Sequence, residues 1–227
     1  MATKINKKEL KQPDTLQSHF AQVLPMLQRQ RTRIVQAGVV LGVIVLLGCG
    51  WVLYEWSNSR AAAALYLKAE DGTMRASISD PSNREKALAT YENIIEQYPR
   101  SSSAMLARYR LAGYAHDQGQ FDRAIEYYNA FIKQAPADSP LVALAGNGLG
   151  SAYEAKGNLA QARQSFERAL SSKAGDGFSG MTHQNLARVF EALNNSGQAL
   201  THYRKALEQV DDPALARLLK RKIALLN

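Results

Sequence analysis

The sequence predicts an all-α protein, in which one N-terminal membrane-spanning helix precedes an α-solenoid of about three to four helix pairs and a C-terminal capping helix. Three observations predict this fold class. An uncharged apolar run lies near the N-terminus, similar segments recur through the rest of the chain, and strand-like alternation is scarce there. A chain of 227 residues, 46% of them hydrophobic, can bury one ordinary core in addition to a membrane helix.

Residues 1–33 are predicted to be a basic tail. Their basic side chains are Lys4, Lys7, Lys8, Lys11, Arg29, Arg31 and Arg33, and their acidic ones are Glu9 and Asp14. The net charge of +8 is therefore concentrated at this end, while the rest of the chain is close to balanced. Because no basic surface is left to follow a phosphate backbone, nucleic acid is not an expected partner.

Residues 34–56 are predicted to cross a membrane. The first twenty read IVQAGVVLGVIVLLGCGWVL and hold no charged side chain. At about 1.5 Å per residue, a helix of that length spans a hydrocarbon core about 30 Å thick. Trp51, Tyr54 and Trp56 come at its far end, and aromatic rings of this kind favour the lipid–water boundary.

The charges on either side of this segment predict its direction. Three arginines (Arg29, Arg31 and Arg33) precede it, whereas the twenty residues after Tyr54 hold only Arg60 and Lys68 as basic side chains. By the positive-inside rule, the tail is cytoplasmic. We therefore expect a bacterial inner-membrane protein whose domain of residues 57–227 lies in the periplasm.

Two forms of processing are alternatives to a permanent anchor. A signal peptidase would use the alanines of residues 61–64, but the apolar run is longer than a signal peptide normally has. The run Leu46-Leu47-Gly48-Cys49 loosely matches a lipidation signal, but apolar sequence continues past it. Cys49 is the only cysteine, so neither an intramolecular disulfide nor a thiolate zinc site is expected.

Beyond residue 57, four similar segments predict stacked helices. Their reference alanines are Ala87, Ala124, Ala162 and Ala199, spaced 37, 38 and 37 residues apart. An aromatic ring follows each alanine by four residues, at Tyr91, Tyr128, Phe166 and Tyr203. This offset places both residues on one helix face, where the small residue lets a neighbouring helix approach and the ring fills the space beside it.

A second helix is predicted before three of these segments. Its marker leucines are Leu111, Leu149 and Leu186, and the turn after it holds Gly119, Gly157 or Asn194-Asn195. Glycine and asparagine tolerate the left-handed conformation that such turns need. We expect the stretch of residues 57–78 to supply the missing first helix, and residues 213–226 to form the cap.

These positions, in this order, resemble the tetratricopeptide repeat (TPR) pattern over residues 84–211. The usual period is 34 residues, and we place the extra residues in loops such as 135–140. The resemblance implies a protein-binding solenoid whose concave face is lined by the first helix of each pair. The groove residues expected there are Tyr109, His116, Asp117, Asn147, Ser151, Glu154, Gln184, Arg188 and Glu191. Only Asn147 matches the carboxylate clamp of some TPR domains, so that mode is not expected.

The sequence predicts neither an enzyme nor a metal or cofactor site. The four histidines are scattered without ligand spacing. The glycines of residues 146–151 imitate part of a phosphate-binding loop, but no strand precedes them and close helix packing explains them better. Ser179 lacks the setting of a nucleophile elbow and is expected in a loop, together with residues 171–177.

The whole layout resembles the YfgM-type ancillary subunit of the Sec translocon, through its basic tail, the run GVVLGVIVLLGCGWVLYEW and an alanine-rich segment after the membrane. This resemblance implies translocon subunits, periplasmic chaperones or emerging secreted chains as partners. Residues 94–112 also resemble Tol-Pal and outer-membrane assembly factors, so an envelope scaffold is an alternative. A scaffold for respiratory-complex maturation is another.

Overall fold

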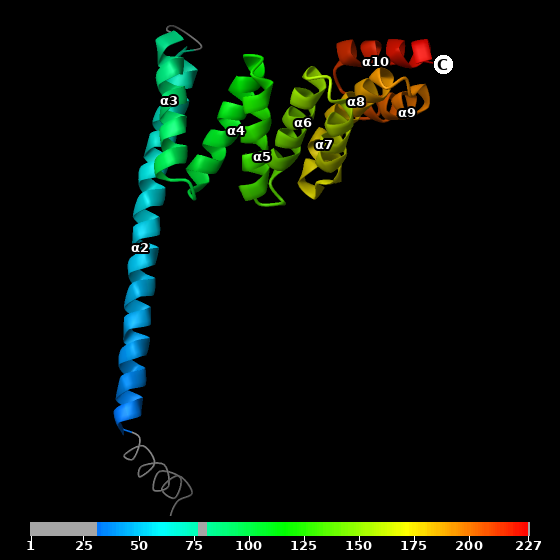
Figure 1. Cartoon of the computed structure of the whole chain (residues 1–227). Coiled ribbons are helices and arrows are strands. Elements are labelled where there is room, and N and C mark those ends of the chain that lie inside the picture. Colours follow the sequence, from blue (N-terminus) through cyan, green and yellow to red (C-terminus); the bar gives the residue numbers. More distant parts are fainter. Residues whose placement is uncertain (1–30, 77–80, 227) are drawn as a thin grey trace, which may run out of the picture. The chain divides into compact units, whose positions relative to one another are not determined.

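The structure, a computed structural model, describes residues 31–76 and 81–226, and these form helices joined by short turns, with no strand among them (Figure 1). Most of the predicted basic tail lies outside the described residues. The helices are α2 (Arg31–Ala76), α3 (Pro81–Gln97), α4 (Ser102–Asp117), α5 (Phe121–Gln134), α6 (Pro140–Ala155), α7 (Leu159–Ser171), the 3-10 helix η2 (Lys173–Phe178), α8 (Ser179–Ala192), α9 (Ser196–Leu207) and α10 (Pro213–Leu226). The all-α prediction is confirmed.

The chain divides into two compact units, residues 1–56 and 57–227. In the first unit, α2 carries the apolar run, whose mean hydropathy reaches 2.3 over 18 residues, none of them buried. Val39, Leu46 and Trp51 are more than half exposed. Exposed apolar surface on this scale is costly in water, and the helix is long enough to cross a bilayer. It is thus a candidate membrane span.

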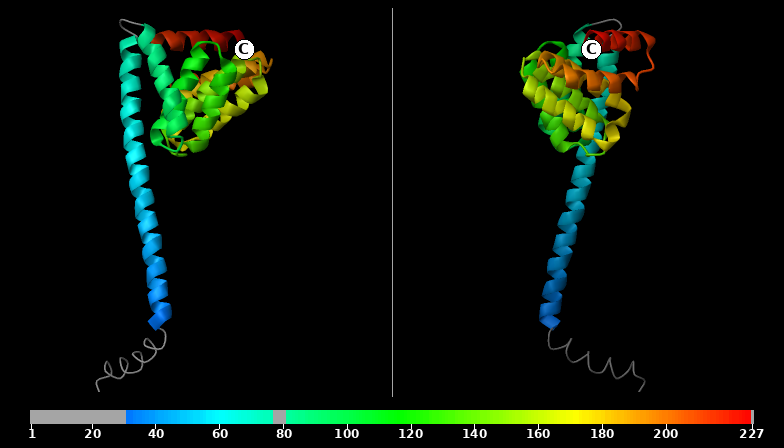
Figure 2. Two further views of the ribbon diagram at one scale, coloured as in Figure 1. Left: turned by 60° about the vertical axis from the view of Figure 1, so that its left-hand side comes forward. Right: turned by 90° about the vertical axis from the view of Figure 1, so that its right-hand side faces the viewer.

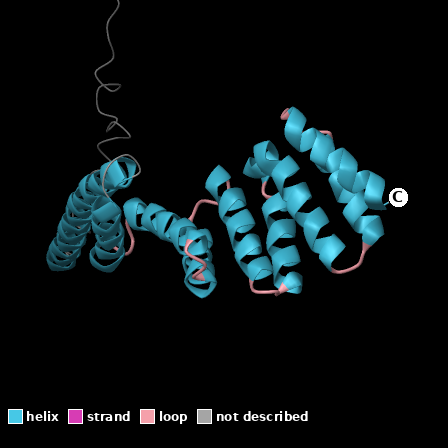
Figure 3. Cartoon of the chain, turned by 90° about the horizontal axis from the view of Figure 1, so that it is seen from above, coloured by secondary structure: helices cyan, strands magenta, loops and turns pink. Residues whose placement is uncertain are grey.

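The second unit is a row of helix pairs, shown from two sides in Figure 2 and from above in Figure 3. Helix α4 pairs with α5, α6 with α7 and α8 with α9, and each second helix also packs on the pair that follows. Helix α10 packs on α9. The first repeat has the expected origin, because Ala62 and Ala69 of α2 share a core cluster with Ala87 and Tyr91 of α3.

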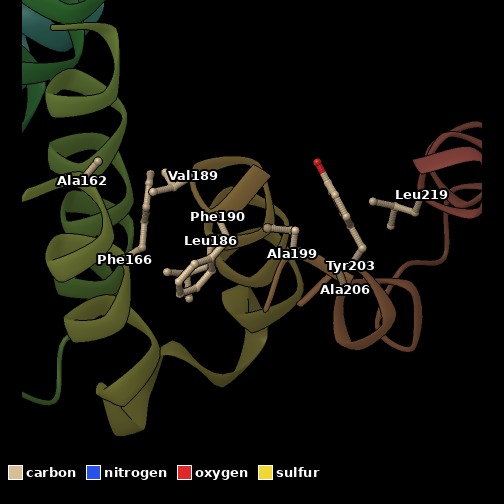
Figure 4. Packing of buried hydrophobic residues seen from close by; sticks show 10 residues of the cluster. Ala162, Phe166, Leu186, Val189, Phe190, Ala199, Tyr203, Ala206 and Leu219 are labelled. Atoms are coloured by element: carbon tan, nitrogen blue, oxygen red, sulfur yellow. The ribbon is translucent and has the colours of Figure 1, made fainter. Parts of the chain in front are cut away.

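The repeated alanines and rings form the core. Where the third repeat meets the last, Ala162, Phe166, Leu186, Ala199 and Tyr203 are almost completely buried in one cluster, and Leu219 of the cap completes it (Figure 4). Burying each large side chain stabilises the fold by about 1.5–3 kcal/mol. The alanines add little burial themselves, but their size lets the helix backbones come close enough for the rings to fill the gaps.

The turns within each pair contain the left-handed residues that the sequence predicted. Gly119 and Gly157 have φ angles of 70° and 76°, and Asn194 has a φ of 56°. The predicted loop around residues 171–179 needs correction. Residues 173–178 form η2, and Ser179 begins α8, where its hydroxyl donates a hydrogen bond to the Asp176 carbonyl.

The glycines of residues 146–151 lie inside α6 and allow close packing, as predicted. A Cβ atom on Gly148 would lie 2.3 Å from Tyr128 Cζ, and one on Gly150 would lie 2.5 Å from Phe166 Cε1. A side chain at either position would therefore overlap an aromatic ring of the preceding or the same repeat. These glycines serve helix packing.

Candidate binding groove

The first helices of the repeats lie next to one another. Helix α4 contacts α6, and α6 contacts α8. Residues three or four positions apart on each of them share one face, so successive helices present parallel rows of side chains. We call the surface formed by these faces of α4, α6 and α8 the groove.

The middle of the groove contains an open hollow of about 610 Å³, which we call the central hollow. It brings together five of the predicted groove residues, which come from three helices. Its lining residues are His116, Asp117, Gly119, Phe121, Ser151, Glu154, Ala155 and Arg188.

An ion pair crosses the central hollow from α6 to α8. The Arg188 guanidinium donates two hydrogen bonds to the Glu154 carboxylate, each 2.6 Å long. The bond to Glu154 raises the pKa of Arg188 above its ordinary value, although burial opposes this. The paired geometry fixes both side chains and leaves their outer edges available to a ligand.

The α4 side of the central hollow carries an exposed carboxylate. Asp117 is 80% exposed, and its Oδ1 lies 3.8 Å from His116 Nδ1. The His116 ring meets the Phe121 ring edge-on, with 5.6 Å between their centroids, which holds the imidazole in place. This arrangement offers hydrogen-bonding groups beside an aromatic surface, as protein-binding sites do.

Tyr109 lies in a second cavity, of about 650 Å³, within the first two repeats. This first-repeat cavity also touches Asp117 and is lined by Tyr91, Tyr114 and Tyr128 together with Met74 and Leu88. The Tyr109 ring lies 5.2 Å from that of Phe131, and burial raises the pKa of its hydroxyl. The cavity therefore combines four tyrosines with charged side chains, among them Glu70, Arg84 and Arg110.

Three predicted residues do not reach either space. Asn147 is only 4% exposed; its amide donates to Thr182 Oγ1 and its carbonyl accepts from Asn185, both at 2.9 Å. It is a packing residue between α6 and α8, and its assignment to the groove surface is corrected here. Gln184 lines a cavity of about 200 Å³ between α8 and the cap. Glu191 accepts hydrogen bonds from Tyr203 and Lys222.

The sequence analysis missed two similar hydrogen-bond networks, each formed by a glutamate, a tyrosine and a basic side chain. In the first repeat, Glu70 accepts from the Tyr91 hydroxyl at 2.6 Å and from Arg110 at 2.7 and 2.9 Å. Glu191, Tyr203 and Lys222 repeat this arrangement in the last repeat, with distances of 2.8 to 3.0 Å. A signal was present, since the base follows the tyrosine by nineteen residues in both networks.

Comparison with known proteins identifies the family. The model of the tetratricopeptide repeat-like domain matches residues 29–227, most of the chain. The chain belongs to this family. TPR-like domains are in general non-enzymatic modules that bind other proteins along an extended concave surface, and this one is accordingly a protein-interaction module.

Solved structures share the TPR-like fold. A MamA protein superposes with a TM-score of 0.57 at 18% identity, covering 73% of this chain and 80% of that one. The MamA of Desulfovibrio magneticus RS-1 gives 0.51 at 20% identity, covering 65% and 75%. Pseudomonas aeruginosa PilF gives 0.56 at 18% identity, covering 75% and 69%. Curated proteins give no significant match. These identities establish similarity of fold.

Proposed function

We propose that this protein is a single-pass inner-membrane adaptor, which holds its TPR-like domain in the periplasm and binds proteins at the Sec translocon, including periplasmic chaperones. The observation that carries the proposal is the presence, in one chain, of an exposed apolar helix and a TPR-like domain with an open groove. An adaptor of this kind brings its guests to the membrane surface.

The predicted direction of the membrane helix supports a periplasmic domain. Arginines precede the apolar run, and the aromatic residues Trp51, Tyr54 and Trp56 follow it. A topology assay tests this directly. In a Cys49→Ser background, a Ser196→Cys variant carries one thiol at an exposed site of the domain. A membrane-impermeant maleimide added to spheroplasts should label it; labelling only after lysis would contradict the proposal.

The composition of the central hollow supports protein guests. It combines Phe121, the paired Glu154 and Arg188, and the exposed Asp117, which suits a polypeptide with its mixture of apolar and polar groups. The resemblance of the membrane segment to the YfgM-type subunit supports the translocon as the place where those guests are met.

Crosslinking in living cells tests the partner. A photo-reactive amino acid at Ser151 lies in the central hollow, and the same amino acid at Gln164, exposed on the second helix α7, is the control. We expect Sec channel subunits or a periplasmic chaperone to be recovered from Ser151 and not from Gln164. Recovery of outer-membrane assembly factors alone would overturn the translocon assignment and favour the envelope scaffold.

A further inference from the structure

We propose that the groove binds an extended apolar polypeptide segment, in the polyproline II conformation, with an apolar side chain at every third residue. This inference rests on the proposed function and specifies the class of guest. It follows from a row of apolar residues along the groove and from a pocket at the end of that row.

The apolar row consists of Leu106, Leu144, Met181 and Leu218, one from each of α4, α6, α8 and α10. The first three lie five positions before the marker leucines, at 111, 149 and 186. Helix α10 has the same register as α4, because Lys222 follows Leu218 by four residues, as Arg110 follows Leu106. Met181 is 41% exposed and Leu218 is 48% exposed, while Leu106 and Leu144 are partly exposed.

An apolar pocket lies at the cap end of this row. It has a volume of about 200 Å³ between α8, α9 and α10, and Met181 is part of its wall. Val210, Leu215 and Leu219 supply most of the remaining apolar lining, Gln184 and Gln209 supply polar groups, and Gly177 leaves its edge open. This size suits one large apolar side chain, which would serve as the anchor of a bound segment.

The spacing of the row selects the conformation of the guest. Packed helices lie about 8–10 Å apart, so the contacts α4 to α6 and α6 to α8 set about that interval between Leu106, Leu144 and Met181. A polyproline II segment rises about 3.1 Å per residue with three residues per turn, which places one side chain on the same side about every 9 Å. A β-strand alternates sides every residue and does not match.

The neighbouring side chains argue against a helical guest. An amphipathic helix presents a broad apolar stripe, about 100° wide. Beside the row lie the polar side chains of Gln184 and Arg221, and Arg188 follows one turn further along α8. The apolar stripe of a bound helix would bury these polar side chains. They instead suit a polyproline II backbone, whose amide and carbonyl groups have no internal hydrogen bonds.

Charge at the cap end indicates the flank of the guest. Arg217 and Arg221 are exposed on either side of Leu218, and the described part of α10 contains no acidic residue. An acidic residue next to the last apolar side chain of the guest would lie close to these guanidinium groups. The partner is therefore an apolar segment with an acidic flank.

Peptide binding to the full-length protein in nanodiscs tests the inference. The probe carries four leucines, one at every third position, with serine, glutamine and proline between them and a glutamate at each end. Its control has the same composition with the leucines clustered. We expect the probe to bind at least about tenfold more tightly than the clustered peptide, and a lysine-ended version to bind more weakly. Equal binding of the probe and the clustered peptide would overturn the inference.

Variants of the groove locate the site. Leu144→Ser and Met181→Ser should each weaken probe binding by about tenfold. Gly177→Val should also weaken it, because a Cβ on Gly177 meets nothing within 4 Å and the added side chain enters the pocket. Leu193→Ser, at a site 42% exposed in the turn after α8, is the matched control. An equal loss with Leu193→Ser, or helical circular dichroism of the bound peptide, would contradict the inference.

One measurement separates this inference from the proposed function. Crosslinking from Ser151 is repeated in a Leu144→Ser/Met181→Ser double variant. Loss of the translocon or chaperone products supports the row as the binding site. Unchanged products would overturn the row while leaving the adaptor function intact, whereas an absence of protein products from the native chain would overturn the function itself.

Discussion

The two ends of the repeat array are joined differently from its middle. At each end, a carboxylate on a first helix accepts hydrogen bonds from the tyrosine of the second helix and from a base on the following helix: Glu70 with Tyr91 and Arg110, and Glu191 with Tyr203 and Lys222. In the middle, the tyrosine and phenylalanine of the same register pack against the glycines of α6.

This difference explains where the groove is open. The residue that corresponds to Glu70 and Glu191 is His116 in the second repeat and Glu154 in the third. Phe166 has no hydroxyl to offer Glu154, which pairs across the groove with Arg188 instead. The end repeats therefore use their polar groups to hold helices together, and the middle repeats turn theirs toward the central hollow.

The largest effect is expected where the middle depends on glycine. Gly148→Ala should lower the free energy of unfolding by about 1–3 kcal/mol, because the new methyl group would overlap the Tyr128 ring. Gly113→Ala is the control, since its Cβ would lie 3.9 Å from the Tyr128 hydroxyl and alanine favours the helix. Denaturant unfolding of the full-length protein in detergent measures both; similar values for the two variants would contradict the packing difference.

Removing tyrosine hydroxyl groups should lower the free energy of unfolding more at the ends of the array than in its middle. Tyr91→Phe and Tyr203→Phe each delete a hydrogen bond to a carboxylate and should cost about 1–2 kcal/mol. Tyr128→Phe should cost less, because no carboxylate accepts from Tyr128 among the described residues. Unfolding of the three variants under one condition provides the comparison, and an equal cost at all three positions would count against it.

Acid should weaken both end networks. Burial raises the pKa of Glu70, but the hydrogen bonds from Tyr91 and Arg110 outweigh it, so its pKa lies below the ordinary value. The bond from Lys222 lowers the pKa of Glu191. A carboxyl group whose pKa is lowered by folding stabilises the folded protein at any pH above the group's pKa in the unfolded chain. This stabilisation is lost as the pH falls through the group's pKa in the folded protein.

Glu70→Gln should therefore destabilise the protein at pH 7, and the difference should shrink as the pH falls below the ordinary carboxyl pKa of about 4.3. Thermal unfolding measured from pH 7 to pH 3 gives the profile. Glu92→Gln is the control, because the pair of Glu92 with Arg123 is about half exposed on both sides and contributes little. A constant difference across the range would show that the carboxylate charge is not involved.

A smaller acid effect should distinguish the last repeat from the first. His183 Nδ1 and His202 Nδ1 lie 2.9 Å apart, and His202 stacks on Phe190 with 5.4 Å between ring centroids. Burial, the neighbouring His183 and the charge of Lys205 lower the pKa of His202 to about 4. Because the unfolded imidazole takes up its proton near pH 6.5, stability should decline as the pH falls from there toward 4.

The His202→Phe variant tests this effect, since a phenyl ring preserves the stack on Phe190. It should flatten the decline of stability between pH 6.5 and 5, where only the imidazole titrates in the unfolded chain, while Glu70→Gln leaves that part of the profile unchanged. An unaltered slope in His202→Phe would contradict the assignment.

Much of the fold could be predicted because its signals are local. The alanine and aromatic positions of each second helix, and the glycine or asparagine of each turn, are fixed by helix geometry within one repeat. Asn147 could not be placed in this way. Its register puts it on the groove face, but the close approach of α6 and α8 buries it against Thr182 and Asn185. The end networks were also missed, because each combines side chains from three helices.

The left-handed turns have a consequence for how the chain folds. Gly119, Gly157 and Asn194 each reverse the chain between two helices that pack directly on each other. Most contacts in the array are consequently close in sequence, and domains with such local contacts fold quickly and form unit by unit. A chain delivered from its N-terminal end can thus complete each helical hairpin on the one already formed, before the next repeat arrives.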